Sequence, residues 1–359
     1  MTLFPALKDA DILVTGHTGF TGGWVCFALR QFGARIHGLA LPPATTPSLF
    51  HLANVEALLT SHTLFDIADH RTVIEHVTAL KPQAILHLAA QPLVLPSYDD
   101  PLGTFQTNVM GTVNILEAAR RTESVKGVVT ITTDKVYANK GRHNHFNETD
   151  RIGGHDPYSA SKAAAEMAID GYRLSLPSWH RDMVIDTARG GNIIGGGDWS
   201  TNRLIPDYAR ALSSNTPLLI RNPQATRPWQ HVLCLVHGYL VLLNRLLSGE
   251  TQKSAEPYGE AWNFGPAPSD CVSVDSILDK IGQSWRRANL EMVPSAVHEA
   301  RTLEIDATKA KQRLGWQPKI GIDEAILLTA EWYKTHEHEP ERLGALTERQ
   351  TESYFSQLS

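Results

Sequence analysis

The stretch DILVTGHTGFTGG, residues 11–23, limits the fold of this chain more than any other feature of its sequence. An apolar run leads into Gly16, and Gly19 and Gly22 follow at GxxGxxG spacing, at the start of a helical pattern that ends near Gly33. Glycines at this spacing let the backbone turn tightly, and the helix N-terminus then offers unpaired N–H groups to an anion such as a pyrophosphate. The stretch predicts a strand, a phosphate-binding turn and a helix. A turn that only joins the strand to the helix is the alternative.

Apolar runs and helical patterns alternate along the first half of the chain. Strands are predicted at residues 11–16, 35–41, 82–90 and 125–133, and a further strand with its exit loop at residues 183–197. Helices are predicted at residues 20–33, 72–80, 107–121 and 158–176. Strands that are apolar along their length and are separated by helices indicate a parallel sheet covered on both faces. The predicted fold class is α/β, a Rossmann-type doubly wound parallel sheet with a smaller interleaved C-terminal substrate lobe.

The composition of the sequence changes beyond Gly195, where Gly, Pro, Asn and Arg become frequent between the predicted helices. We expect a dinucleotide-binding Rossmann domain at residues 1–190, with late elements from residues 230–264, and a substrate-binding lobe at residues 191–229 and 265–335. Residues 336–359 are polar and are expected to form a loosely held tail.

Composition excludes several classes of partner. The chain has 33 Lys and Arg against 38 Asp and Glu, a net charge of −5, and no block of like charges, which argues against nucleic acid or an anionic membrane. No signal peptide is predicted. The longest apolar segment is interrupted by His237, Asn244 and Arg245, so no membrane span is predicted either. The three cysteines lie far apart without a CxxC spacing, so we expect reduced thiols in a cytoplasmic protein.

The segment after the second predicted strand indicates which dinucleotide the turn binds. Residues 39–48, LALPPATTPS, contain no acid to bind an adenosine ribose, and no arginine lies between Arg35 and Arg71 to accept a 2′-phosphate. We therefore predict NAD rather than NADP. Asp66 and Ile67 are candidates for contact with the adenine edge, and a helix N-cap is the alternative for Asp66.

Tyr158 and Lys162 are four residues apart on a predicted helix, so their side chains project from one face. The ammonium group can lower the pKa of the phenol and support a nicotinamide ribose, and the phenol can then accept a proton. Thr133, at the end of a predicted strand, can hydrogen-bond to the hydroxyl group that Tyr158 deprotonates. Together with the glycine turn, these residues favour oxidation and reduction of an alcohol.

This combination resembles the extended short-chain dehydrogenase/reductase superfamily, over nearly the whole chain to about Trp332. Longer matches resemble one family within it, the CDP-glucose 4,6-dehydratases. The matching segments are GHTGFTGGW, PPATTPSLF, HLAAQPLV, SYDDP, TNVMGTVNILEA, TTDKVY, GGHDPYSASK, GGNIIGGGDW, RLIPD, IRNPQATRPWQHV and WNFGP.

The resemblance implies a reaction in which a sugar is oxidised at C4, loses water across C5 and C6, and receives its hydride back at C6. Tyr158 and NAD would make the transient ketone. By resemblance, Asp134 protonates the departing C6 hydroxyl and Lys135 takes the C5 proton. A 4-epimerase of the superfamily needs no such pair, and a surface salt pair at a strand end is the other alternative for these two residues.

The resemblance also implies two sets of contacts. Cofactor contacts are expected from Gly16, Thr18, Gly19, Phe20, Gly22, Asp66, Ile67, Ala89, Ala90, Asn108, Tyr158 and Lys162. Substrate contacts are expected from Asn192, Arg203, Leu204, Arg227, Trp229 and Arg301. Trp229 or Tyr208 can pack against sugar or base, although an aromatic residue in such a place more often belongs to the core. His143, His145 and His155 have no ligand spacing, so no metal is predicted.

The sequence departs from the family pattern near the expected hexose. The loop at residues 139–155 differs, with His155 in place of a tyrosine, and Leu95 stands where an arginine is usual. Arg301 and Thr302 replace histidine and tyrosine, and Thr21 replaces a lysine. An epimerase or reductase with another nucleotide sugar is therefore a second hypothesis, and a non-catalytic nucleotide-sugar binding protein is a third.

The partner implied by the resemblance is a nucleotide sugar, a CDP-hexose, and the implied pathway is deoxysugar synthesis for lipopolysaccharide O-antigen. The predicted helices at residues 107–121 and 159–172 resemble the pair that forms a dimer interface in relatives, so a homodimer is expected. Internal packing is the alternative explanation for their small and apolar residues.

Overall fold

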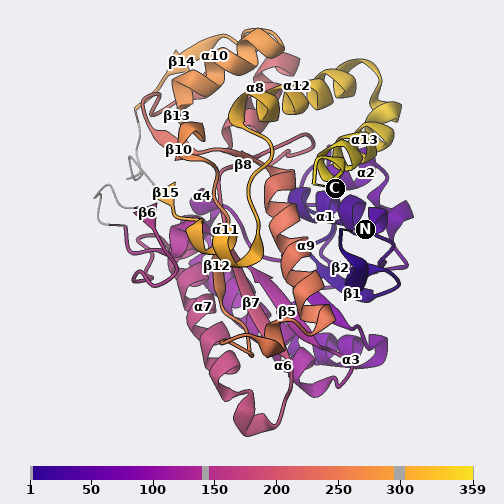
Figure 1. The fold of residues 1–359 in the computed structure, drawn as a ribbon. Helices are drawn as coiled ribbons and strands as arrows, with labels where there is room; N and C mark the ends of the chain where they lie inside the picture. Colours follow the sequence, from indigo (N-terminus) through magenta and orange to yellow (C-terminus); the bar gives the residue numbers. More distant parts are fainter. Residues whose placement is uncertain (1–2, 140–144, 295–303, 359) are drawn as a thin grey trace.

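A seven-stranded parallel sheet lies at the centre of the computed structural model, which describes residues 3–139, 145–294 and 304–358 (Figure 1). Its strands follow the spatial order β12-β7-β5-β4-β1-β2-β3, and each pairs in parallel with its neighbour. They are β1 (Asp11–Thr15), β2 (Arg35–Ala40), β3 (Ser61–Leu64), β4 (Ala84–His87), β5 (Gly127–Ile131), β7 (Val184–Arg189) and β12 (Ala261–Asn263). The predicted Rossmann-type α/β fold is confirmed.

Helices cover both faces of the sheet because its strands are apolar on both faces. On β1, Ile12 and Val14 belong to one core cluster and Leu13 belongs to another, as alternation along a strand requires. The first cluster includes α1 (Phe20–Gln31) and α9 (Val232–Ser248). The second includes α3 (His70–Leu80), α6 (Thr112–Arg121) and α7 (Pro157–Ser175).

The chain between β4 and α6 is irregular in a way that the sequence did not predict. After α4 (Val94–Asp99) and α5 (Pro101–Phe105), residues Gln106–Gly111 form a π-helical turn, η3, before α6 begins. The predicted helix at 107–121 is therefore not α-helical throughout. A Cβ atom on Gly111 would lie 2.5 Å from Ile67 Cδ1, so this turn packs closely on the residues that follow β3.

The smaller lobe lies at the top of Figure 1, around α8 (Leu204–Ser214), α10 (Val274–Ser284) and α12 (Ile322–His338). Short strand pairs complete it and join it to the sheet domain. These pairs are β8 (Ile193–Ile194) with β11 (Gln230–His231), β9 (Leu218–Ile220) with β14 (Leu290–Met292), β10 (Thr226–Pro228) with β13 (Cys271–Ser273), and β6 (His145–Phe146) with β15 (Glu304–Ile305). Two further helices are α2 (Leu49–Leu52) and α11 (Thr308–Leu314). The predicted domain boundaries stay a prediction.

The expectation of a loosely held tail after residue 336 is wrong. Helix α12 continues to His338, and α13 (Leu343–Ser356) packs against α1. The ring centroids of Phe355 and Phe32 are 5.1 Å apart. The buried residues of α13 are Leu343, Leu346, Thr347, Gln350, Thr351, Tyr354 and Phe355. They recur at spacings of three and four residues, so one face of a mainly polar segment is buried.

No helix in the described part of the chain is long and apolar enough to cross a membrane. The three cysteines are unpaired; Cys26 and Cys234 are buried, and Cys271 is half-buried.

Candidate active site

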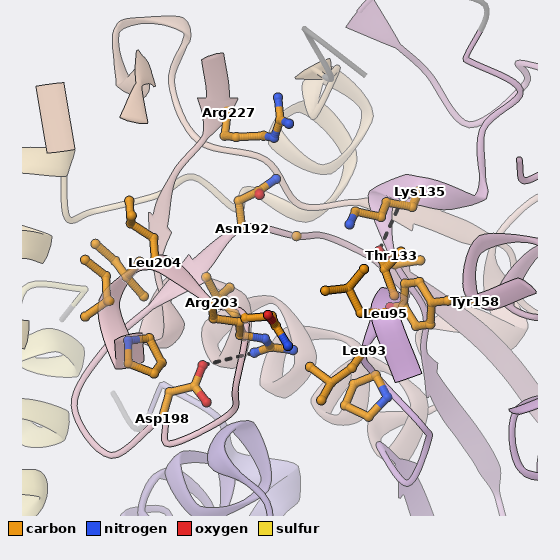
Figure 2. A pocket seen from close by; sticks show the side chains of 18 of the residues that line it. Leu93, Leu95, Thr133, Lys135, Tyr158, Asn192, Asp198, Arg203, Leu204 and Arg227 are labelled. Atoms are coloured by element: carbon orange, nitrogen blue, oxygen red, sulfur yellow. Dashed lines mark hydrogen bonds and ion pairs between the residues drawn. The ribbon is translucent and has the colours of Figure 1, made fainter. Parts of the chain in front are cut away.

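A cavity of about 1600 Å³ opens where the sheet domain meets the smaller lobe. The carboxyl end of β5, the start of α7 and the loop after β7 form its wall on the sheet side, and the start of α8 and the segment after Thr216 form the other wall. Ligands bind at the carboxyl ends of the strands in open parallel sheets. This cavity is therefore the candidate active site (Figure 2).

Helix α7 presents Tyr158 and Lys162 to this cavity. Pro157 occupies the first turn, and Asp156 and Ser159 form a reciprocal capping box, so the helix begins immediately before Tyr158. The Tyr158 backbone N–H donates to Ser97 Oγ at 3.0 Å, which attaches the start of α7 to α4. Lys162 Nζ donates to the carbonyl of Ile131 at 3.3 Å, at the end of β5.

The pKa of Tyr158 differs from the expectation. Burial raises the pKa of the Tyr158 phenol to about 12, opposed by a hydrogen bond with Thr133 and by the charge of Arg203. Burial also lowers the pKa of Lys162 to about 8, against the charge of Glu166. The predicted lowering of the Tyr158 pKa is therefore wrong for the protein alone, because desolvation outweighs the groups that favour the phenolate.

Thr133, Asp134 and Lys135 follow β5 and form a tight turn, η4 (Asp134–Val136). Thr133 Oγ1 accepts from the Lys135 N–H at 3.3 Å and donates to Asp134 Oδ1 at 3.0 Å. Lys135 Nζ lies 6.0 Å from the centre of the Tyr158 ring, and Figure 2 shows Thr133, Lys135 and Tyr158 on the same side of the cavity. Thr133, Lys135 and Tyr158, which the sequence analysis assigned to one site, therefore lie close together.

Asp134 is a buried carboxyl group, only 1% exposed. Its Oδ2 atom accepts from Asn192 Nδ2 at 3.1 Å, and a Cβ atom on Gly191 would lie 2.2 Å from its Oδ1 atom. Burial raises the pKa of Asp134, against the charges of Lys135 and Arg227 and the hydrogen bond from Thr133. A carboxyl group that keeps its proton to a higher pH than usual can act as an acid.

The glycine turn is as tight as its spacing predicted. A Cβ atom on Gly22 would lie 2.2 Å from the carbonyl oxygen of Gly16, and one on Gly16 would lie 2.8 Å from the nitrogen of Ala89. Gly16 also has a φ of +76°, in the region that favours glycine. Thr18 Oγ1 donates to the carbonyl of Leu41 at 2.8 Å, which joins the turn to the end of β2.

The other predicted cofactor residues surround this turn. Asn108 accepts from the Gln91 N–H at 2.8 Å and donates to Ser161 Oγ at 2.9 Å, so it fixes the chain after Ala89 and Ala90 against α7. Gly19 is the residue before α1, and a Cβ atom on it would lie 3.3 Å from Gly16 O. A Cβ atom on Gly195 would lie 3.2 Å from the ring of Phe20, so Phe20 packs against the residue that follows β8.

Asp66 and Ile67 lie beyond β3. Asp66 is exposed and accepts from the Ala68 N–H at 2.9 Å, whereas the N-cap of α3 is Asp69, so the N-cap alternative for Asp66 is wrong. The Ile67 side chain is buried in the core.

Most of the predicted substrate residues line the cavity. Arg203 ion-pairs with Asp198 at 3.0 Å, and Leu204 begins α8 beside it. Arg227 and Trp229 line the far wall, and the Trp229 indole donates to the carbonyl of Val272 at 3.1 Å. Tyr208 is buried and donates to the carbonyl of Arg286, so it is a core residue. Arg301 lies outside the described residues.

Sequence reasoning missed two features of the cavity. Asp198, which binds Arg203, lies only five residues before it in GGGDWSTNR, and this acid–base spacing was the available signal. Leu93 joins Leu95 in an apolar wall beside Tyr158, as Figure 2 shows. Among the described residues, no group of three or more His, Cys, Asp or Glu side chains could hold a metal ion.

Comparison with known proteins identifies several similar chains. Residues 13–329 match the family model described as GDP-mannose 4,6 dehydratase. The chain is 40% identical over 329 residues to a CDP-glucose 4,6-dehydratase of Salmonella typhimurium, covering 90% of each chain. It is 29% identical to a dTDP-glucose 4,6-dehydratase of Xanthomonas campestris, over 91% of this chain and 94% of that protein.

Solved structures with the same fold include enzymes of two kinds. A UDP-glucose 4-epimerase from Thermotoga maritima, solved with UDP-glucose, has a TM-score of 0.77 at 20% identity, over 91% of this chain and 99% of that chain. DesIV, a dTDP-glucose 4,6-dehydratase from Streptomyces venezuelae solved with NAD, has a TM-score of 0.76 at 22% identity, over 92% and 99%. The fold alone does not separate the two chemistries.

Replacing Asp134 by Asn tests the cost of burying this carboxyl group. Because the pKa of Asp134 is raised on folding, its contribution to stability is complete below its unfolded pKa and is lost as pH rises through its folded pKa. We expect the free energy of unfolding of Asp134→Asn, relative to wild type, to rise between about pH 4 and about pH 8 in urea titrations. Asp99→Asn, at an exposed position, is the control; an Asp134→Asn difference that is equal at both pH values contradicts the prediction.

Proposed function

The chain belongs to the GDP-mannose 4,6-dehydratase family, and from that membership we propose that it is an NAD-dependent nucleotide-sugar 4,6-dehydratase that converts CDP-glucose to CDP-4-keto-6-deoxyglucose. The observation that carries this proposal is the buried Asp134 carboxyl group, whose pKa is raised, next to Lys135 and in one cavity with Tyr158. An acid and a base beside the oxidation site are what water elimination requires. The 40% identity to a CDP-glucose enzyme supports CDP-glucose as the substrate.

The glycine turn fits NAD. Gly16, Gly19 and Gly22 leave a backbone cradle that a Cβ atom would fill, at the N-terminus of α1, where unpaired N–H groups favour a pyrophosphate. The carboxyl end of β2 carries Ala40 and Leu41, without an arginine for a 2′-phosphate. When bound, NAD supplies the hydride acceptor for C4 of the sugar and the hydride donor for C6.

The protein side chains handle the protons of the reaction. Tyr158 accepts the proton of the C4 hydroxyl, which requires a pKa below the value of about 12 in the protein alone; Thr133 and Arg203 act in that direction. Once C4 is a ketone, the C5 proton is acidic and Lys135 removes it.

Asp134 protonates the C6 hydroxyl, which leaves as water, and Lys135 returns a proton to C5 when C6 is reduced. The sugar loses one water molecule and undergoes no net oxidation. A proton that passes through Lys135 exchanges with solvent, so the C5 hydrogen of the product reports on this step.

Asp134→Asn and Lys135→Ala are expected to lower kcat for ketosugar formation by about 10²- to 10⁴-fold, the usual contribution of an acid or base. The assay is conversion of CDP-glucose in deuterated water, with deuterium at C5 measured by mass spectrometry. Lys126→Ala is the control, because Lys126 is exposed and directly precedes the start of β5. A wild-type product without deuterium at C5 would refute the dehydratase mechanism, and two active variants would favour an epimerase or reductase. Absence of turnover with every nucleotide hexose would favour a binding protein.

Gly22→Ala is expected to weaken NAD binding at least about tenfold, or 1.4 kcal/mol, because the added methyl group displaces the backbone at Gly16. The measurement is titration of the purified protein with NADH, followed by nicotinamide fluorescence. Gly171→Ala is a matched control, since a Cβ atom there meets nothing within 4 Å. Equal affinities in the two variants would contradict the assignment of the turn.

We also propose a homodimer formed through α5, η3 and α7. Large apolar side chains are exposed on these elements at Leu102, Phe105, Met110 and Met167, the last being 68% exposed. Light scattering is expected to give the mass of two chains, and Met167→Glu to shift it toward one. Leu327→Glu, at an exposed position on α12, is the control. A wild-type mass of one chain would refute the proposal.

Cytoplasmic location, expected from the cysteines, and a role in lipopolysaccharide O-antigen synthesis, expected from the resemblance, stay predictions. Cell fractionation, and the glycans of a strain that lacks the protein, are the measurements that test them.

A further inference from the structure

Glu166 on α7 and Arg189 at the end of β7 form a buried ion pair next to the cavity. Their side chains are 2% and 5% exposed, and Arg189 Nε donates to the two Glu166 oxygens at 2.8 and 3.0 Å. Neither residue lines the cavity. Because desolvation offsets most of the attraction in a buried pair, stability alone is a weak explanation for it.

The pair holds the residue that precedes the turn of Thr133, Asp134 and Lys135. Thr132 Oγ1 donates to Glu166 Oε1 at 2.6 Å, and the Thr132 backbone N–H donates to the carbonyl of Ala188 at 2.9 Å. The chain is therefore fixed in two directions where it leaves β5.

The same pair holds the residue that closes the turn. Arg189 donates from its Nη1 atom to the Tyr137 hydroxyl oxygen at 2.9 Å, and that hydroxyl donates to Asn263 Oδ1 at 2.7 Å. Tyr137 is buried and is the C-cap of η4, two residues after Lys135. One guanidinium–carboxylate pair thus binds the chain on both sides of the turn.

Arg189 also leads directly into the segment that contacts Asp134. The Asp134 backbone N–H donates to the carbonyl of Gly190 at 3.3 Å, Gly191 lies against its carboxyl group, and Asn192 binds that group. A displacement at either end of the turn would move the Asp134 carboxyl group relative to Asn192.

We propose that Glu166 and Arg189 are positioning residues, which hold both ends of the turn so that Asp134 and Lys135 keep the geometry needed for proton transfer. The catalytic part of this inference rests on the proposed function, because there the turn supplies the acid and the base. The structural part does not depend on the reaction.

The test leaves the charged pair intact, because removal of one partner strands a buried charge and can prevent folding. Thr132→Val and Tyr137→Phe each remove one hydroxyl that binds the pair, at opposite ends of the turn. Thr132→Ser restores the hydroxyl. Thr130→Val is the matched control, since Thr130 is also buried at the end of β5 and donates to the carbonyl of Asp186 at 2.9 Å, away from the pair.

Thr132→Val and Tyr137→Phe are expected to lower kcat for ketosugar formation by about 10- to 100-fold with KM within about twofold, the size expected for a displacement of about 1 Å at a reacting group. Thr132→Ser and Thr130→Val should stay near wild type in the same assay, and incorporation of deuterium at C5 should slow in parallel with kcat. Equal losses in Thr130→Val and Thr132→Val, or no loss in either end variant, would overturn the proposal.

Crystal structures of Thr132→Val and Thr130→Val provide a second measurement that is independent of turnover. The contact between Asp134 and Asn192 should be lost or lengthened only in Thr132→Val. If the wild-type protein makes no ketosugar, the proposed function fails, and these structures alone decide whether the pair positions the turn. An unchanged contact in Thr132→Val would overturn the inference.

Discussion

The site depends on the parallel pairing of β5 with β7, which brings the segments that follow these two strands side by side. Two backbone hydrogen bonds join them beyond the ladder of the sheet, from Thr132 to Ala188 and from Asp134 to Gly190. These bonds place the Asp134 side chain against Gly191, where any side chain at that position would overlap its carboxyl group. The surroundings of the Asp134 carboxyl group thus come from two strands that neighbour each other in space, although more than fifty residues separate them in sequence.

Burial shifts the pKa values of the titratable groups in this site in different directions. Desolvation raises the pKa of Asp134 and of Tyr158 and lowers the pKa of Lys162, so each neutral form is favoured. Glu166 on α7 is paired with the Arg189 guanidinium group, whereas Asp134 is bound by an amide and a hydroxyl group, and burial raises the pKa of Asp134.

Much of the site was predictable because its residues follow local rules. The glycine turn depends on backbone space within seven residues, and the pairing of Tyr158 with Lys162 depends on helical spacing. Other features had no local signal. Tyr137 and Arg189 meet because β5 and β7 pair in the sheet, and the buried face of α13 was hidden by its polar composition. The direction of the Tyr158 pKa was also wrong, since residue identities do not reveal how strongly a group is desolvated.

From the sequence alone one could predict five strands of the sheet, the helices between them, the tight glycine turn and the residue types available for chemistry. These follow from apolar periodicity, glycine conformation and spacing along one element. Only the tertiary structure decided which residues surround Asp134, how Arg203 is paired with Asp198, and that one ion pair binds the chain on both sides of the turn after β5. Those outcomes depend on the register between strands and on burial, which arise only when distant segments pack together.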